Sequence, residues 1–144
     1  MSISEWSESH AVHIPAVDDE HRHIFRLCAD LQRAMMAGGP SAEIQTEIQT
    51  IVEDLVIHTA QHLSHEEREM RAARYPLYAW HRHQHQAARA RVKAFNRRVR
   101  RGDSDAAGEL IRYLSGWLND HIRLADRMLG AYLRNHQREL SCSR

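Results

Sequence analysis

Apolar residues recur every three or four positions in four long segments of this chain, and this period most constrains its fold. The segments are about 18–37, 41–72, 76–100 and 105–134. Polar residues occupy the rest of each segment, so the pattern predicts four amphipathic α-helices that each bury one stripe. The turns between them are predicted at Gly38-Gly39-Pro40-Ser41, Arg74-Tyr75-Pro76 and Arg101-Gly102-Asp103-Ser104-Asp105.

Three short connections favour helices that run antiparallel to their neighbours. We therefore predict an all-α fold, an up-down-up-down antiparallel four-helix bundle. An N-terminal arm, residues 1–17, precedes the bundle, and a short polar tail, residues 136–144, follows it. Ser41 is predicted as a helix N-cap, and Pro76 as a first helical residue. No internal repeat or linker divides the sequence, so we expect a single domain over 1–144.

Composition excludes several classes of protein. Of 144 residues, 42% are hydrophobic, which is enough for a packed core, and the net charge is only +1. One basic run, Arg97–Arg101, has no interleaved aromatic residues, so we expect no nucleic-acid partner. The N-terminus does not resemble a secretory signal, and no apolar run approaches the roughly 18 residues of a membrane span. Two cysteines cannot form a disulfide framework, which indicates a cytoplasmic protein.

The predicted buried stripes are interrupted by polar residues on all four helices. These are His21, His62, Glu66, His81, His85 and His121. Burying such groups without partners costs roughly 1–3 kcal/mol each, so six in a small core would be very destabilising. A metal explains them economically, because imidazole nitrogen and carboxylate oxygen are metal ligands.

Spacing supports a common site. His62 with Glu66, and His81 with His85, lie four residues apart and therefore on one helix face. Asp126 follows His121 by five residues, about 140° around an α-helix, which makes it geometrically the weakest member.

The other histidines lie off these stripes. His23 and His83 are two residues from predicted ligands and should face solvent. His10, His13 and His136 lie outside the four segments and should be solvated.

Five imidazoles and two carboxylates are too many donors for one ion. If both carboxylates bridge two ions together with an oxide or hydroxide, three histidines complete six-coordination at one ion. Two histidines then leave the other ion five-coordinate, and its open position suits a small diatomic molecule. The same ligand types also suit manganese and zinc. The zincin and ferritin-like motifs are incomplete in this sequence, and no paired-cysteine zinc motif is present.

The assembled pattern resembles the hemerythrin family, in its single-domain bacterial form, from Trp6 to about Leu133. The matching stretches are Asp18-Asp19-Glu20-His21, His62-Leu63-Ser64-His65-Glu66-Glu67-Arg68-Glu69-Met70, Tyr75-Pro76 with His81 and His85, and Trp117-Leu118-Asn119-Asp120-His121-Ile122 with Asp126. The seven ligand positions occur in order with family-like spacing, which makes the resemblance highly specific.

The resemblance implies two Fe ions in a non-haem di-iron centre with an oxo or hydroxo bridge. It implies that His81, His85 and His121 hold the saturated ion, that His21 and His62 hold the open one, and that Glu66 and Asp126 bridge them. In the family, O2 binds reversibly at the open ferrous ion as a hydroperoxide, and two electrons come from the irons. The expected function is therefore O2 binding for transport, storage, delivery or sensing.

Two alternatives remain open at this point. One is an enzyme that reduces peroxide or nitric oxide at the same iron, and the other is an iron-handling or redox-sensing module. We expect an oxygen-binding protein rather than an enzyme, with nitric oxide, peroxide and small anions as further candidate ligands. A protein partner is not identified by the sequence. Two departures from the family pattern are Leu63 and His58, and His58 is either a core histidine or a donor to the site.

Overall fold

The computed structural model describes residues 5–38 and 41–142. Gly39 and Pro40 of the first predicted turn lie outside the described residues, as do residues 1–4 and the last two residues of the predicted tail.

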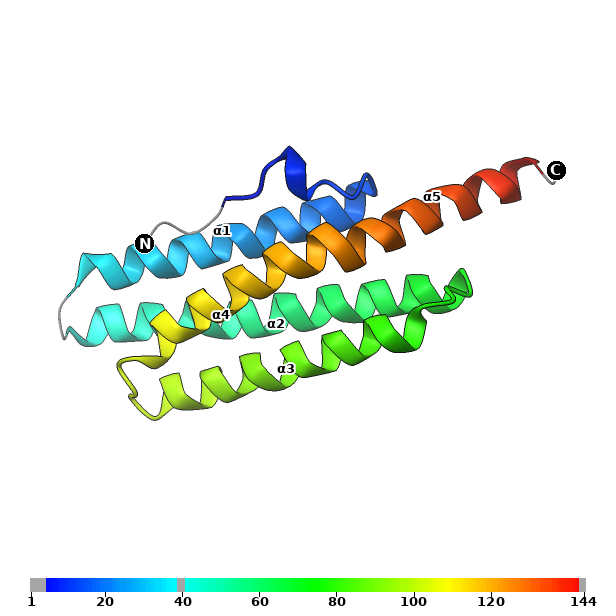
Figure 1. Cartoon of the computed structure of the whole chain (residues 1–144). Helices are drawn as coiled ribbons and strands as arrows, with labels where there is room; N and C mark the ends of the chain where they lie inside the picture. The colour runs from blue at the N-terminus through cyan, green and yellow to red at the C-terminus, as the bar shows by residue number, and fades with distance from the viewer. Residues whose placement is uncertain (1–4, 39–40, 143–144) are drawn as a thin grey trace.

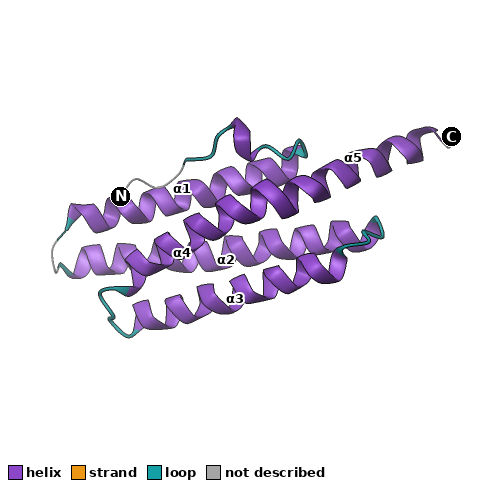
Figure 2. Ribbon diagram, in the orientation of Figure 1, coloured by secondary structure: helices purple, strands orange, loops and turns teal. Residues whose placement is uncertain are grey.

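The described chain is helical throughout its long elements, and none of its described residues forms a strand (Figure 2). The elements are η1 (Glu8–His10), α1 (Pro15–Ala37), α2 (Ala42–Ala72), α3 (Tyr78–Arg100), α4 (Ala106–His121), η2 (Ile122–Asp126) and α5 (Arg127–Cys142). The last three follow one another without a break and form one long rod. Figure 1 shows four rods that run alternately up and down, which confirms the predicted four-helix bundle.

The helix ends confirm some predicted boundaries and correct others. The Ser41 hydroxyl accepts a hydrogen bond from the Ile44 N–H at 3.2 Å, as an N-cap should. Pro76 is not a first helical residue, because α3 begins two residues later at Tyr78. The first helix begins at Pro15, three residues before the predicted start, with the proline in the position that needs no N–H. Gly102 adopts φ 85°, which glycine tolerates, in the predicted third turn.

The fourth rod differs most from the prediction. Residues Ile122–Asp126 form a π-helical turn, in which each N–H bonds five residues back instead of four. The wider turn shifts the buried stripe that follows by one residue. In a regular α-helix the buried stripe through Leu114 and His121 would continue at Met128 and Tyr132. Instead Leu129 and Leu133 are buried, Met128 is exposed and Tyr132 is half-buried. The predicted end of the fourth helix, at about residue 134, is too early, because α5 stays helical to Cys142 and projects beyond the other rods (Figure 1).

Two apolar clusters fill the bundle along its length. The larger packs all four rods around residues such as Leu31, Leu55, Val92 and Leu114. The smaller lies toward the α2–α3 turn and contains Met70, Tyr75, Leu129 and Leu133. Along α2, α3 and the fourth rod, the predicted ligands lie between these two clusters. Apolar packing on both sides therefore fixes the position of the ligands along the bundle axis. No helix in the described part of the chain is long and apolar enough to cross a membrane.

Candidate metal centre

All seven predicted ligand side chains meet inside the bundle. They come from all four rods: His21 from α1, His62 and Glu66 from α2, His81 and His85 from α3, and His121 and Asp126 from the fourth rod. Each is buried, and the most exposed of them, His121, shows only 5% of its surface. They form two sets, and within each set one donor atom from every residue lies within 4.8 Å of the others. Both sets share Glu66 and Asp126.

Each carboxylate divides its two oxygens between the sets. Asp126 Oδ1 lies 3.0 Å from both His81 Nε2 and His121 Nε2, while its Oδ2 lies 3.0 Å from His21 Nε2. Glu66 Oε1 lies 3.1 Å from His85 Nε2, and its Oε2 lies 3.4 Å from His62 Nε2. One set therefore has three imidazoles and the other has two, and two carboxylates span both.

The π turn explains how Asp126 joins the cluster. In a regular α-helix, residues five apart point about 140° from each other, at roughly 100° per residue. With five residues in the wider turn, His121 and Asp126 come onto the same face, and their side chains meet at 3.0 Å. The spacing that looked unfavourable from the sequence is therefore the spacing that this turn requires.

The donor atoms of the cluster are not satisfied by the protein itself. Within the described residues, both oxygens of Glu66 and of Asp126, both ring nitrogens of His21 and His85 Nε2 are buried without a geometrically sound hydrogen-bond partner. Leaving a buried polar atom unpaired costs about 1–3 kcal/mol. His81 Nε2 and His121 Nε2 point at each other at 3.1 Å, which is how lone pairs converge on a shared point. The set fits a pair of metal ions held by nitrogen and oxygen.

Outer hydrogen bonds fix three of the imidazoles. Each of these rings donates a hydrogen bond through its Nδ1–H group. His62 donates to Glu20 at 3.0 Å, His85 to Glu67 at 2.9 Å, and His121 to Gln84 at 2.8 Å. A neutral ring that donates through Nδ1 keeps its Nε2 lone pair free, and Nε2 is the atom that faces the cluster. Sequence reasoning missed these three acceptors, since they lie on flanks of the helices that carry no periodic signal.

Charge keeps the carboxylates ionised in the metal-free chain. Burial and the neighbouring Asp126 act to raise the pKa of Glu66, but His62, His81 and His85 outweigh them and lower it to about 2. Burial likewise acts to raise the pKa of Asp126, and His121, His21 and His81 hold it well below its usual value. Burial acts to lower the pKa of His81, while the approach of both carboxylates raises it to about 9. The cluster thus carries two anionic bridging groups ready for cations.

The remaining histidines divide into confirmed and corrected predictions. His83 is exposed, as predicted. His23 is half-buried instead of solvent-facing, with its ring 4.4 Å from that of His58 on the adjoining helix. Burial, His58 and Arg26 together lower the pKa of His23. His58 contacts this ring and belongs to neither donor set of the described residues, so it is not a ligand candidate.

His10 is the clearest error among the histidines, because it is 2% exposed and not solvated. Its Nε2 lies 2.8 Å from Asn119 Oδ1 on the fourth rod. Nothing periodic in the arm indicates this contact, which joins residues more than a hundred positions apart.

Trp117 forms one wall beside the cluster. Its ring stacks on His121 with centroids 4.3 Å apart and an interplanar angle of 13°. It is half-buried and lines a surface groove of about 380 Å³ together with Gln84 and Leu124. The Trp117 ring therefore covers one face of the His121 ring, and His121 itself also lines the groove.

Fold and site together define a helical-bundle protein with a non-haem metal pair in its core. Residues 12–133 match the family described as "Hemerythrin HHE cation binding domain". The match covers most of the sequence, and the chain belongs to the hemerythrin family.

Individual relatives agree over nearly the whole length. The chain is 28% identical to a bacteriohemerythrin of Stenotrophomonas maltophilia, over 94% of this chain and 85% of that protein. It is 30% identical to a myohemerythrin of Sipunculus nudus, over 84% of this chain and 86% of that protein. A crystal structure of wild-type hemerythrin superposes with a TM-score of 0.81 at 22% identity, covering 92% and 98% of the two chains, and supports the fold.

Proposed function

We propose that this protein binds O2 reversibly at a non-haem di-iron centre. The observation that carries the proposal is the division of the carboxylate oxygens between a set of three imidazoles and a set of two. His81, His85 and His121 would hold one iron, His21 and His62 the other, and Glu66 and Asp126 would bridge them with an oxo or hydroxo group. Relatives named bacteriohemerythrin and myohemerythrin support the same function.

A ferrous pair held by these residues would supply two electrons to O2. The chain's own task is to hold unequal coordination, since His21 and His62 offer one imidazole fewer than the opposite set. The protein also excludes water. Leu63, which follows His62, and Ile122, which follows His121, are apolar and fully buried. A dry site favours reversible binding, because proton delivery and hydrolysis are suppressed.

We also propose that the protein acts in the cytoplasm as a single hemerythrin-like domain. Both cysteines are free thiols, Cys28 buried and Cys142 exposed, which suits a reducing compartment. Nitric oxide, peroxide and small anions are candidate ligands of the same open position.

Spectroscopy of matched variants tests the proposal. Iron-loaded, reduced protein should develop a visible absorption band in air that vanishes under argon, over repeated cycles. The His62→Ala variant should lose this band, because the open ion loses one of its two imidazoles. The His83→Ala variant should behave like the parent, since that ring is exposed.

Two results would contradict the proposal. Equal behaviour of the two variants would show that His62 is not a ligand. Rapid irreversible oxidation of the parent, with turnover of peroxide or nitric oxide, would indicate an enzyme instead.

A further inference from the structure

The N-terminal arm is a built element with defined contacts. The Ser7 N–H donates to His10 Nδ1 at 3.0 Å, so the other ring nitrogen carries the proton and donates to Asn119 Oδ1 at 2.8 Å. The His10 ring also packs 5.1 Å from that of Phe25. Ala11 and Val12, which follow, are 4% and 1% exposed. The arm therefore lies against the bundle in one fixed register.

The arm contacts the fourth rod before, within and after its π turn. Asn119 bonds to His10 just before the turn. Inside the turn, Arg123 donates to the Ser9 hydroxyl at 3.2 Å, and directly after it Arg127 donates to the Ser9 carbonyl oxygen at 2.6 Å.

One turn further along, the arm and the rod touch closely. Arg134 donates to the Val12 carbonyl oxygen. At Gly130, an added Cβ would lie 2.5 Å from the same oxygen, so only glycine permits this approach.

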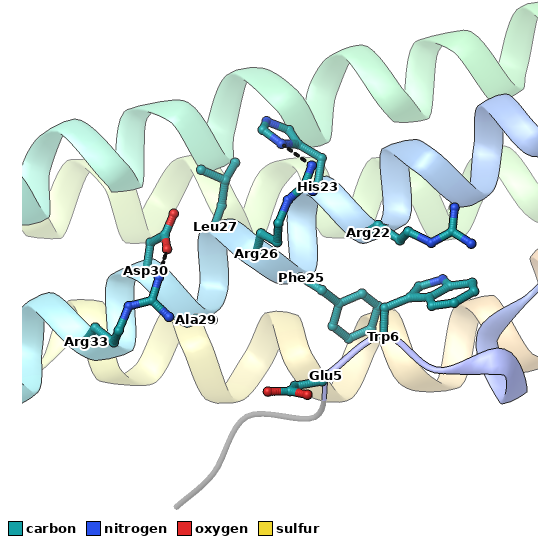
Figure 3. A pocket seen from close by; sticks show the side chains of 10 residues that line it. All are labelled: Glu5, Trp6, Arg22, His23, Phe25, Arg26, Leu27, Ala29, Asp30 and Arg33. Carbon is teal, nitrogen blue, oxygen red and sulfur yellow. Dashed lines mark hydrogen bonds and ion pairs between the residues drawn. The ribbon is translucent and has the colours of Figure 1, made fainter.

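The other side of the arm is tied to α1. Figure 3 shows Trp6 beside Arg22 and Phe25, and the Arg22 guanidinium lies 4.0 Å from the centre of the Trp6 ring. The Asp18 carboxylate accepts the N–H groups of Val12 at 2.9 Å and of His13 at 3.1 Å. The arm thus joins the start of α1 to the π turn.

A π turn needs such support, because it is rare and has no intrinsic advantage over continued α-helix. If residues 122–126 returned to α-helical geometry, Asp126 would rotate out of the cluster by about 140°. With the turn in its present register, Arg123 and Arg127 both donate to Ser9 of the arm.

We propose that the arm, through Ser9, Arg123 and Arg127, is a positioning element that holds the π turn and so keeps Asp126 between the two imidazole sets. The importance of this role for metal binding rests on the proposed di-iron function. Arg123 and Arg127 touch no donor atom of the cluster and act only through the backbone that carries Asp126.

Hydrogen exchange on metal-free protein tests whether the arm holds the π turn in the absence of iron. In an Arg123→Ala/Arg127→Ala variant, the amides of residues 122–127 should exchange about tenfold faster, as expected for losing a hydrogen bond from a charged donor. The control is Arg138→Ala, an exposed arginine on the projecting end of α5, which should change nothing. Wild-type exchange of the turn in the double variant would overturn the proposal, provided that circular dichroism shows a folded bundle.

Metal binding tests the consequence for Asp126. With Co²⁺ as the probe, the double variant should show an altered visible spectrum and about tenfold faster transfer of the ion to a chelator. Among single variants, Arg127→Ala should change the Co²⁺ spectrum and speed metal transfer. Arg127→Lys, which keeps a hydrogen-bond donor, should restore both to the parent's values. A merely structural role would lower stability without changing the spectrum, and an unchanged spectrum would overturn the proposal. If the parent itself binds no metal pair, the proposed function is wrong. The hydrogen-exchange experiment then still shows whether the arm holds the π turn.

Discussion

Two regions of the same bundle are equally buried but chemically opposite. The apolar half, defined by the larger cluster around Leu31, Leu55, Val92 and Leu114, is built from hydrocarbon side chains and one thiol, Cys28. The histidine half, defined by the seven clustered residues, contains buried carboxylates and imidazoles with unpartnered atoms. All four rods run through both regions, so each helix has one stretch buried among apolar side chains and one that presents polar donor atoms.

The fold and the site depend on different sources of stability. Apolar burial stabilises the first half at roughly 25 cal/mol per Å² and needs no ligand. The second half places charged groups in a poorly solvated interior, which is unfavourable until a cation satisfies them. We therefore expect the chain to release and rebind metal without losing its fold.

The largest effect should come from the apolar half. Leu114 is fully buried, and Leu114→Ala should lower the free energy of unfolding by about 2–5 kcal/mol through lost burial and a new cavity. The loss should be the same with and without bound metal, and two ions should still bind. Urea denaturation of both forms measures it, with Leu140→Ala at a 57% exposed position on α5 as the control. A loss that appears only in the loaded form would show that the halves are not independent.

Removing the metal should have a somewhat smaller effect, limited to the histidine half. At free metal a hundred times its dissociation constant, binding adds about 2.7 kcal/mol to stability. Amides at 62–70 and 121–126 should therefore exchange faster in the metal-free protein, while those at 110–114 should stay protected. Hydrogen exchange with and without chelator measures this. Uniform acceleration along α4 would mean that metal supports the whole bundle.

The sequence predicts the apolar half well and the histidine half incompletely. Helical period places His21, His62, Glu66, His81 and His85 on buried faces, because period reports which side of a regular helix is apolar. It fails from Ile122 onward, where the π turn adds a residue and Leu129 and Leu133 replace the predicted Met128 and Tyr132. A π turn has no local signature, since tertiary contacts hold it.

The contacts of the N-terminal arm could not be predicted from the sequence either. His10, predicted to be solvated, is buried by a hydrogen bond to Asn119, a contact between distant segments that no local pattern encodes. The acceptors Glu20, Glu67 and Gln84 were missed for a related reason, since an outer partner is defined by the ring that it meets. Their detection requires the three-dimensional arrangement.

The smallest effect concerns the two thiols and tests the boundary between the halves. Burial raises the pKa of Cys28 to about 12, so at pH 8 it stays protonated, and only a thiolate attacks a disulfide reagent. Cys142 is exposed at the end of α5. We expect one fast-reacting thiol per chain, none in Cys142→Ser, and a second only after denaturation. The same counts should hold in metal-free protein, because Cys28 belongs to the apolar half. If metal removal by a chelator alone made Cys28 reactive, the apolar half would also open when metal is lost. The two halves would then form one cooperative unit.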